Sequence, residues 1–220
     1  MSMRPAHSMT GNPSALAAQR RVAPLEAGAL NLPNAITLTR LLLSIALFVL
    51  IDIRGYWLTS AALFVVAAST DFLDGYIARK YGLVTTLGRI LDPFVDKIII
   101  GGAFIFLLGK QAEPGLEGAV LSSGVTAWMT IIVIGREMFI TSLRAFLEQH
   151  GRDFSAAWSG KIKMGLQCAA VTASLLSLSP ELGSQQWLLS TRDVLLWGAV
   201  VSTVYSGLVY VKRAAEMLRA

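Results

Sequence analysis

The chain has 220 residues, of which 54% are hydrophobic and 15% are charged, and its mean hydropathy is +0.59. An ordinary soluble domain contains roughly 25% charged residues, so these values favour a protein with several membrane-spanning helices. The single cysteine excludes a disulfide within the chain. The only two histidines are far apart in sequence, which argues against a zinc site.

The N-terminal segment differs from the rest of the chain. It contains four prolines and no apolar run of signal-peptide length. We expect residues 1–33 to form a flexible extension, with a short basic juxtamembrane helix near residues 14–22. Residues 34–220 are expected to form one transmembrane domain.

Six apolar runs follow in chain order, at residues 35–53, 56–78, 90–109, 119–145, 160–179 and 190–211. Each is close to the roughly 20 residues with which a helix crosses the hydrocarbon layer. The breaks between them contain glycine, proline and charged residues, which are typical of loops. The sequence therefore predicts an all-α integral membrane fold with six transmembrane helices.

Basic residues indicate the orientation of these helices. Sixteen lysines and arginines fall on the side of the two termini, whereas only Arg54, Lys110 and Arg192 fall on the other side. Basic residues collect on the cytoplasmic side of membrane proteins. We therefore expect both termini in the cytoplasm and a multi-pass location in the cytoplasmic (inner) membrane.

The most informative stretch is TDFLDGYIARKYGLVTTLGRILDPFVDK, residues 70–97. It contains four aspartates, namely Asp71, Asp74, Asp92 and Asp96. Helical spacing places the first pair on one face and the second pair on one face of the next helix. Because a short loop joins the two helices, both acidic stripes are expected to face one polar cavity at the cytoplasmic side.

Four carboxylates in one cavity repel one another, and a positive charge must compensate them. Arg79 and Lys97 could neutralise part of this charge, or the aspartates could be solvated. Divalent cations would compensate more of the negative charge, because hard cations prefer oxygen ligands. Two such ions suit phosphoryl transfer, and ionisable groups within membrane spans usually have a function.

These residues also form a recognisable pattern. The sequence reads Asp71-x-x-Asp74-Gly75-x-x-Ala78-Arg79, then Gly88, Asp92 and Asp96 at fixed intervals. This pattern resembles the signature of the CDP-alcohol phosphotransferases, with every position filled. The resemblance covers roughly residue 31 to the C-terminus and leaves the N-terminal extension outside.

The resemblance implies transfer of a phosphatidyl group from CDP-diacylglycerol to an alcohol, with release of CMP. It implies that Asp71, Asp74 and Asp92 hold two Mg²⁺ or Mn²⁺ ions and that Asp96 borders the second ion and acts as general base. It assigns a further group to the CDP-diacylglycerol site: Asn34, Thr37, Gly75, Arg79 and Thr85. It also implies a homodimer surrounded by membrane lipids.

The acceptor alcohol is indicated by residues 135–144 and 160–163, which resemble the corresponding segments of phosphatidylglycerophosphate synthases. That resemblance implies sn-glycerol 3-phosphate as acceptor. Independently, four basic residues at cytoplasmic helix ends favour an anionic acceptor, namely Arg136, Arg144, Lys161 and Lys163. They could instead anchor the helices to anionic lipid. An inositol phosphate acceptor also stays open, because charge alone does not separate the two.

Two other classes of protein place carboxylates in membranes. A membrane prenyltransferase binds diphosphate through magnesium, but usually carries its acidic motifs far apart in sequence. An ion-coupled transporter would place its site near the bilayer midplane, often within an internal repeat, which this sequence lacks. The pI of about 9.6 does not require a nucleic-acid partner, because topology explains the basic excess.

Overall fold

The computed structural model describes residues 32–81, 86–116, 120–149 and 158–219. Side chains are described there except at 32–34, 71–81, 86–90, 92, 114, 148, 158–159 and 218–219. The described part consists of α2 (Leu32–Ile53), α3 (Trp57–Tyr81), α4 (Thr86–Leu108), β1 (Glu113–Pro114), β2 (Val120–Leu121), α5 (Ala127–Gln149), α6 (Trp158–Leu176) and α7 (Gln186–Arg219). These six helices confirm the predicted all-α class.

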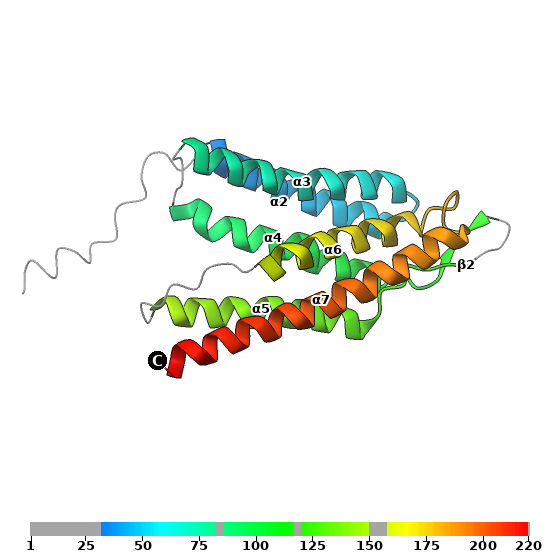
Figure 1. Ribbon diagram of the computed structural model, residues 1–220. Coiled ribbons are helices and arrows are strands. Elements are labelled where there is room, and N and C mark those ends of the chain that lie inside the picture. The colour runs from blue at the N-terminus through cyan, green and yellow to red at the C-terminus, as the bar shows by residue number, and fades with distance from the viewer. Residues whose placement is uncertain (1–31, 82–85, 117–119, 150–157, 220) are drawn as a thin grey trace, which may run out of the picture.

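The helices form one elongated bundle (Figure 1). Helix α2 packs against α3 and α4, α6 packs against α3 and α7, and α5 packs against α4 and α7. One end of the bundle gathers the start of α4, the ends of α3 and α5, and the C-terminal end of α7. The short hairpin of β1 and β2, which pairs Glu113 with Leu121, lies at the opposite end.

The centre of the bundle is apolar and contains side chains from all six described helices. Leu47, Phe64, Phe104, Leu175 and Leu196 each have no more than 1% of their surface exposed. They belong to one continuous cluster, which also contains side chains of α5 and therefore joins all six described helices. A single core of this kind fixes the helices that surround it relative to one another.

Large apolar side chains also cover the outside of the bundle. Leu42 and Ile45 on α2, and Val194, Val201 and Leu208 on α7, are each more than half exposed. Soluble proteins rarely expose so much contiguous apolar surface. Within the described residues, two helical stretches are long and apolar enough to cross a membrane, Ala35–Ile53 and Gln186–Met217. The outer surface is therefore suited to lipid.

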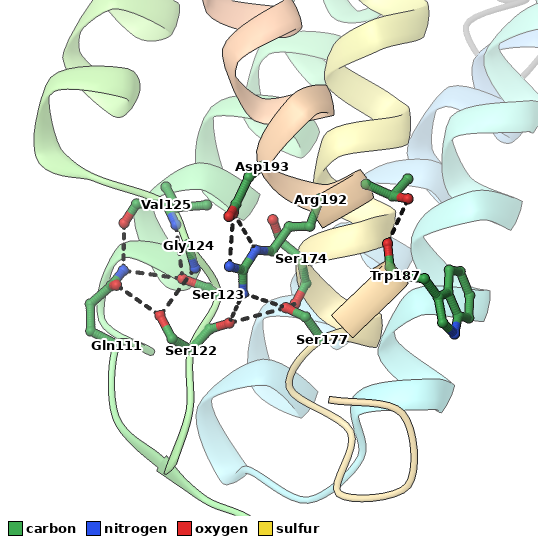
Figure 2. Close-up of polar contacts among 11 residues, drawn as sticks. Gln111, Ser122, Ser123, Gly124, Val125, Ser174, Ser177, Trp187, Arg192 and Asp193 are labelled. Atoms are coloured by element: carbon green, nitrogen blue, oxygen red, sulfur yellow. Dashed lines mark hydrogen bonds and ion pairs between the residues drawn. The ribbon is translucent and has the colours of Figure 1, made fainter. Parts of the chain in front are cut away.

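The predicted fourth apolar run was wrong at its beginning. Residues 120–126 are not the start of a helix, since Val120–Leu121 form β2 and α5 begins only at Ala127. The side chain of Gln111 explains this, because its amide donates to Ser123 Oγ at 3.1 Å and to the backbone carbonyl of Val125 (Figure 2). These contacts hold the segment in a turn.

Arg192, at the start of α7, joins this turn to the end of α6 (Figure 2). Its Nη1 donates to the Ser122 carbonyl at 2.7 Å and to Ser177 Oγ at 3.4 Å, while its Nε donates to Asp193 Oδ1 at 2.9 Å. The buried guanidinium therefore ties three segments together at the hairpin end of the bundle.

Gly124 is essential to this arrangement. Its φ is +73°, and a Cβ there would lie 2.7 Å from Arg192 Nε. We expect Gly124→Ala to destabilise the protein by about 2–3 kcal/mol, because it adds backbone strain and displaces a buried charge. Gly55 is the matched control: its φ is +82°, but a Cβ added there would meet nothing within 4 Å.

Gly55→Ala should therefore show the strain alone, about 1 kcal/mol. Thermal unfolding of the two purified variants in detergent measures the difference. Equal decreases in Tm for the two variants would show that the overlap between the added Cβ and Arg192 does not lower the stability of Gly124→Ala.

Candidate functional site

A cavity of about 310 Å³ lies between α4, α5 and α6, where it is lined by the second half of α5 and the first half of α6. Its polar lining consists of Asp96, Lys97, Arg136, Glu137, Thr141, Arg144, Lys163 and Gln167. Pro93, Ile100, Ile140, Ala145 and Met164 complete the wall. Four cationic side chains therefore face two carboxylates, and the excess of positive charge suits an anionic ligand.

Asp96 enters this cavity from α4. Its carboxylate is 31% exposed and forms an ion pair with Arg40, which projects from α2 and is 1% exposed. A buried guanidinium is stable only when a carboxylate or other acceptors compensate it. The contact therefore holds the Asp96 carboxylate at a defined position on the cavity wall.

Glu137 organises the basic side of the cavity. Its Oε1 accepts from Arg136 Nη1 at 3.1 Å and also forms an ion pair with Lys163 on α6. Arg136 Nη2 donates to Ser206 Oγ at 2.6 Å, and its guanidinium lies 5.4 Å from the centre of the Tyr210 ring. These contacts with α7 fix the guanidinium, since hydrogen bonding and cation–π attraction act together.

Arg144 lies two helical turns beyond Arg136 on α5 and lines the same cavity. Among the side chains that the structure describes, none forms an ion pair or hydrogen bond with Arg144, and its Nε is buried without an acceptor. A guanidinium in this state retains most of its hydrogen-bonding capacity for a ligand. It is the cation of this cavity best suited to bind a phosphate.

Comparisons with known proteins point to one family. The family model described as CDP-alcohol phosphatidyltransferase matches residues 30–205. The chain belongs to this family. The match confirms the resemblance indicated by the aspartate motif, and it includes every helix that lines the cavity.

Individual relatives of this CDP-alcohol phosphatidyltransferase extend over most of the chain. A CDP-diacylglycerol–glycerol-3-phosphate 3-phosphatidyltransferase from Bacillus subtilis is 38% identical over 86% of this chain and 97% of its own length. An enzyme of the same name from Rickettsia typhi is 33% identical over 83% and 96%. A probable phosphatidylglycerophosphate synthase from Mycobacterium tuberculosis is 33% identical over 84% and 81%.

The predicted site residues of this family member fall into three groups. The structure brings Asp96, Arg136, Arg144 and Lys163 together around one cavity. Thr37 is buried on α2, one turn before Arg40, whereas Lys161 on α6 is exposed and does not line this cavity. Outside the residues with described side chains lie Asn34, Asp71, Asp74, Gly75, Arg79, Thr85 and Asp92.

The predicted metal site therefore concerns mainly residues whose side chains are not described. Among the side chains that are described, no group of three histidines, cysteines or carboxylates could hold an ion. Of the four predicted metal ligands, Asp96 is the one whose side chain is described. Its partly exposed carboxylate is a suitable oxygen donor for Mg²⁺ or Mn²⁺.

Two charged residues that hold other side chains of the site in place were not predicted from the sequence. Arg40 is a cation within an apolar helix, and such a residue usually has a function, so this signal was available. Glu137 lies inside the segment that resembled phosphatidylglycerophosphate synthases, but a carboxylate was not expected in a basic pocket. Its role became visible only through its contacts with Arg136 and Lys163.

Proposed function

We infer that the chain transfers the phosphatidyl group of CDP-diacylglycerol to sn-glycerol 3-phosphate, giving phosphatidylglycerophosphate and CMP. The relatives named for this reaction cover more than four-fifths of the chain, at 33–38% identity. The observation that carries the inference is the cavity, in which a carboxylate on α4 lies opposite a basic wall from α5 and α6. Prenyl transfer and ion transport have no comparable support.

The basic wall is proposed to bind the phosphate of the acceptor. Arg144 retains donors for a ligand, while Arg136 and Lys163 are held in place by Glu137. Positioned donors bind a phosphate dianion more strongly than mobile ones, because less side-chain entropy is lost on binding. Lys161 is proposed to contribute positive charge at the entrance and not in the cavity itself.

The reaction then needs a base for the acceptor hydroxyl, and we assign this role to Asp96. The hydroxyl oxygen forms a new bond to the phosphatidyl phosphorus, the bond from that phosphorus to the CMP oxygen breaks, and Asp96 accepts the hydroxyl proton. Arg40 orients the carboxylate through their ion pair. Asp96 and the acceptor phosphate site share one cavity, so both ends of the acceptor can be held at once.

Two divalent cations are proposed to be held by Asp71, Asp74, Asp92 and Asp96. When bound, they stabilise the negative charge that develops on the transferred phosphoryl group. The donor site is proposed to include Asn34, Thr37, Gly75, Arg79 and Thr85. Of these, Thr37 has a described side chain, and its position one turn from Arg40 supports a place beside the acidic residues.

The membrane arrangement is proposed from charge and surface. Sixteen of the 19 basic residues fall on the side of the two termini, which supports a cytoplasmic cavity and six spans in the cytoplasmic membrane. The apolar outer faces of α2 and α7 support contact with lipid. We also propose that the protein forms a homodimer. Residues 1–33 are proposed to form a separate N-terminal extension.

The acceptor is tested by product analysis. Purified protein receives labelled CDP-diacylglycerol with glycerol 3-phosphate, inositol phosphate or serine in separate reactions, and the lipid product is identified by mass. We expect phosphatidylglycerophosphate from the first reaction only. Efficient formation of a phosphatidylinositol phosphate would instead assign the basic cavity to the alternative acceptor.

Arg144→Ala tests the phosphate site. We expect it to raise the KM for glycerol 3-phosphate by about 10- to 100-fold, because a charged hydrogen bond contributes roughly 1.5–3 kcal/mol. The KM for CDP-diacylglycerol should change by less than about twofold. Lys212→Ala is the matched control, since Lys212 is an exposed cation of α7 that does not line the cavity. If Lys212→Ala raised the KM for glycerol 3-phosphate equally, Arg144 would not be a specific phosphate ligand. The same conclusion would follow if Arg144→Ala raised the KM of both substrates equally, because Arg144 would then act only through its charge near the membrane surface.

A further inference from the structure

Gln167 is a neutral, buried residue of the cavity lining. It lies on α6, one turn after Lys163, and has 1% of its surface exposed. The other neutral polar side chain of the lining is Thr141, which is exposed and donates its hydroxyl proton to the Glu137 carbonyl of its own helix at 2.7 Å. Gln167 therefore adds a buried amide to a lining whose remaining polar residues are charged.

A contact with α7 fixes the orientation of this amide. Gln167 Nε2 donates to Thr203 Oγ1 at 3.0 Å, and Thr203 donates its own hydroxyl proton to the Ala199 carbonyl at 2.6 Å. Because a hydroxyl has one proton, Thr203 Oγ1 can only accept from Gln167, so the amide nitrogen lies on the α7 side. Among the described residues, none donates a hydrogen bond to Gln167 Oε1. This oxygen is therefore available to a ligand in the cavity.

Gln167 lies at the inner end of the cavity. Helices α4 and α6 both run toward the hairpin end of the bundle (Figure 1). In this direction, Ile100 lies one turn beyond Asp96, and Gln167 lies one turn beyond Lys163. The inner end thus combines an apolar side chain from α4 with an amide from α6, and the charged groups of these helices lie nearer the other end.

This division of the lining fits the groups of glycerol 3-phosphate. In the proposed reaction, the phosphate binds the basic wall and the reacting hydroxyl on C1 faces Asp96. The hydroxyl on C2 lies between these two ends and carries no charge. A hydroxyl that leaves water without a new hydrogen-bond partner costs about 1–3 kcal/mol. Gln167 Oε1 is a neutral acceptor that could remove this cost.

We propose that Gln167 accepts a hydrogen bond from the C2 hydroxyl and thereby selects sn-glycerol 3-phosphate, with Thr203 as the positioning residue for its amide. This proposal rests on the proposed function, which supplies the acceptor. Contacts with Asp96, the basic wall and Gln167 together define the handedness of C2. The mirror-image acceptor, sn-glycerol 1-phosphate, can keep two of these contacts but then directs a C–H group at Gln167. Such an analogue is rejected, because a buried polar group of the site is left unpaired.

Three acceptors test this assignment: sn-glycerol 3-phosphate, sn-glycerol 1-phosphate and 3-hydroxypropyl phosphate. The last keeps the phosphate and the reacting hydroxyl but lacks the C2 hydroxyl. Each is supplied to purified wild-type and Gln167→Met protein in detergent, with saturating CDP-diacylglycerol. Methionine has nearly the length and volume of glutamine but no amide. The measured quantity is kcat/KM for each acceptor.

We expect the wild-type protein to prefer sn-glycerol 3-phosphate over each analogue by about 10- to 100-fold. Gln167→Met should lower kcat/KM for sn-glycerol 3-phosphate by a similar factor. It should leave kcat/KM for 3-hydroxypropyl phosphate within about threefold, because that analogue never makes the contact. The preference should therefore almost disappear. Since the preference is a ratio, a smaller fraction of folded protein does not alter it.

Thr203→Val tests the positioning of the amide, because Thr203 itself does not line the cavity. It should lower the preference by about three- to tenfold, and Thr203→Ser, which keeps the hydroxyl, should restore it. Ser174→Ala is the matched control, since Ser174 is a buried polar residue two turns further along α6 that does not line this cavity. It should leave kcat/KM for every acceptor within about twofold.

Two outcomes would overturn the proposal. An equal loss with all three acceptors in Gln167→Met would show that the amide supports the cavity as a whole and does not contact the C2 hydroxyl. A wild-type protein that forms phosphatidylglycerophosphate but uses 3-hydroxypropyl phosphate equally well would show that the C2 hydroxyl is not recognised. A wild-type protein that forms no phosphatidylglycerophosphate would instead refute the proposed function.

Discussion

Replacing Asp96 with asparagine should lower turnover by about 10³-fold or more while binding of CDP-diacylglycerol stays measurable. A general base contributes about 10²–10⁴-fold to rate, and the amide of asparagine cannot accept the proton from the acceptor hydroxyl. The same change weakens one proposed metal contact, which adds to the loss. Formation of labelled phosphatidylglycerophosphate measures turnover, and calorimetric titration with donor measures binding.

This variant also removes the ionic partner of the buried Arg40, so stability must be followed in parallel. Asp96→Glu separates the two effects, because it keeps the negative charge for Arg40 but displaces the carboxylate from the acceptor. We expect Asp96→Glu to fold normally and to remain severely impaired. Asp52→Asn is the matched control, because Asp52 is an exposed carboxylate at the C-terminal end of α2. This variant should retain activity within about twofold.

Near-normal turnover of Asp96→Asn would remove its assignment as base. The ion pair with Arg40 would then be structural, and another group would have to accept the proton. Normal turnover in Asp96→Glu together with loss in Asp96→Asn would mean that charge at this position matters and exact placement does not.

Removal of divalent cations is expected to abolish activity completely. The four aspartates are proposed to share one site, where they could not all stay ionised without compensating charge, and the proposed chemistry needs that charge at the phosphoryl group. After treatment with EDTA and dialysis, product formation should fall to background. Addition of Mg²⁺ or Mn²⁺ should restore it, whereas the larger Ca²⁺, which prefers more ligands at longer distances, should restore less.

A binding measurement should accompany this activity test. Ligands that bind only the folded state raise its stability, by about 2.7 kcal/mol at 100 times Kd. Mg²⁺ should therefore raise the Tm of the stripped wild-type protein, and raise it less in Asp96→Asn. Full activity after metal has been reduced below the protein concentration would contradict the proposed metal site.

Local sequence patterns predicted much of this protein. The aspartate motif occupies residues 71–96, and its spacing along two helices is a property of the helix itself. Helical spacing also placed Arg136 and Arg144 on one face, and the structure shows both on one cavity wall. The apolar runs predicted six helices, since the hydrophobic signal of a long helix is independent of its partners.

The errors in the bounds of the helices had two physical causes. The start of α5 was misplaced because Gln111, more than ten residues earlier in the chain, holds residues 122–125 in a turn. Helix α7 also extends past the predicted end at 211, to Arg219, because charged residues end a hydropathy signal without ending a helix. Hydropathy reports composition, whereas hydrogen bonds between segments decide where an element begins.

By itself, the sequence determined the helical class, the acidic motif and the family, because each depends on the type and spacing of residues that are close along the chain. Only the tertiary structure decided that Arg40 pairs with Asp96 across 56 positions and that Glu137 joins Arg136 to Lys163. These features depend on which helix faces pack together. Packing is decided by the fit of the whole bundle, which no local spacing contains.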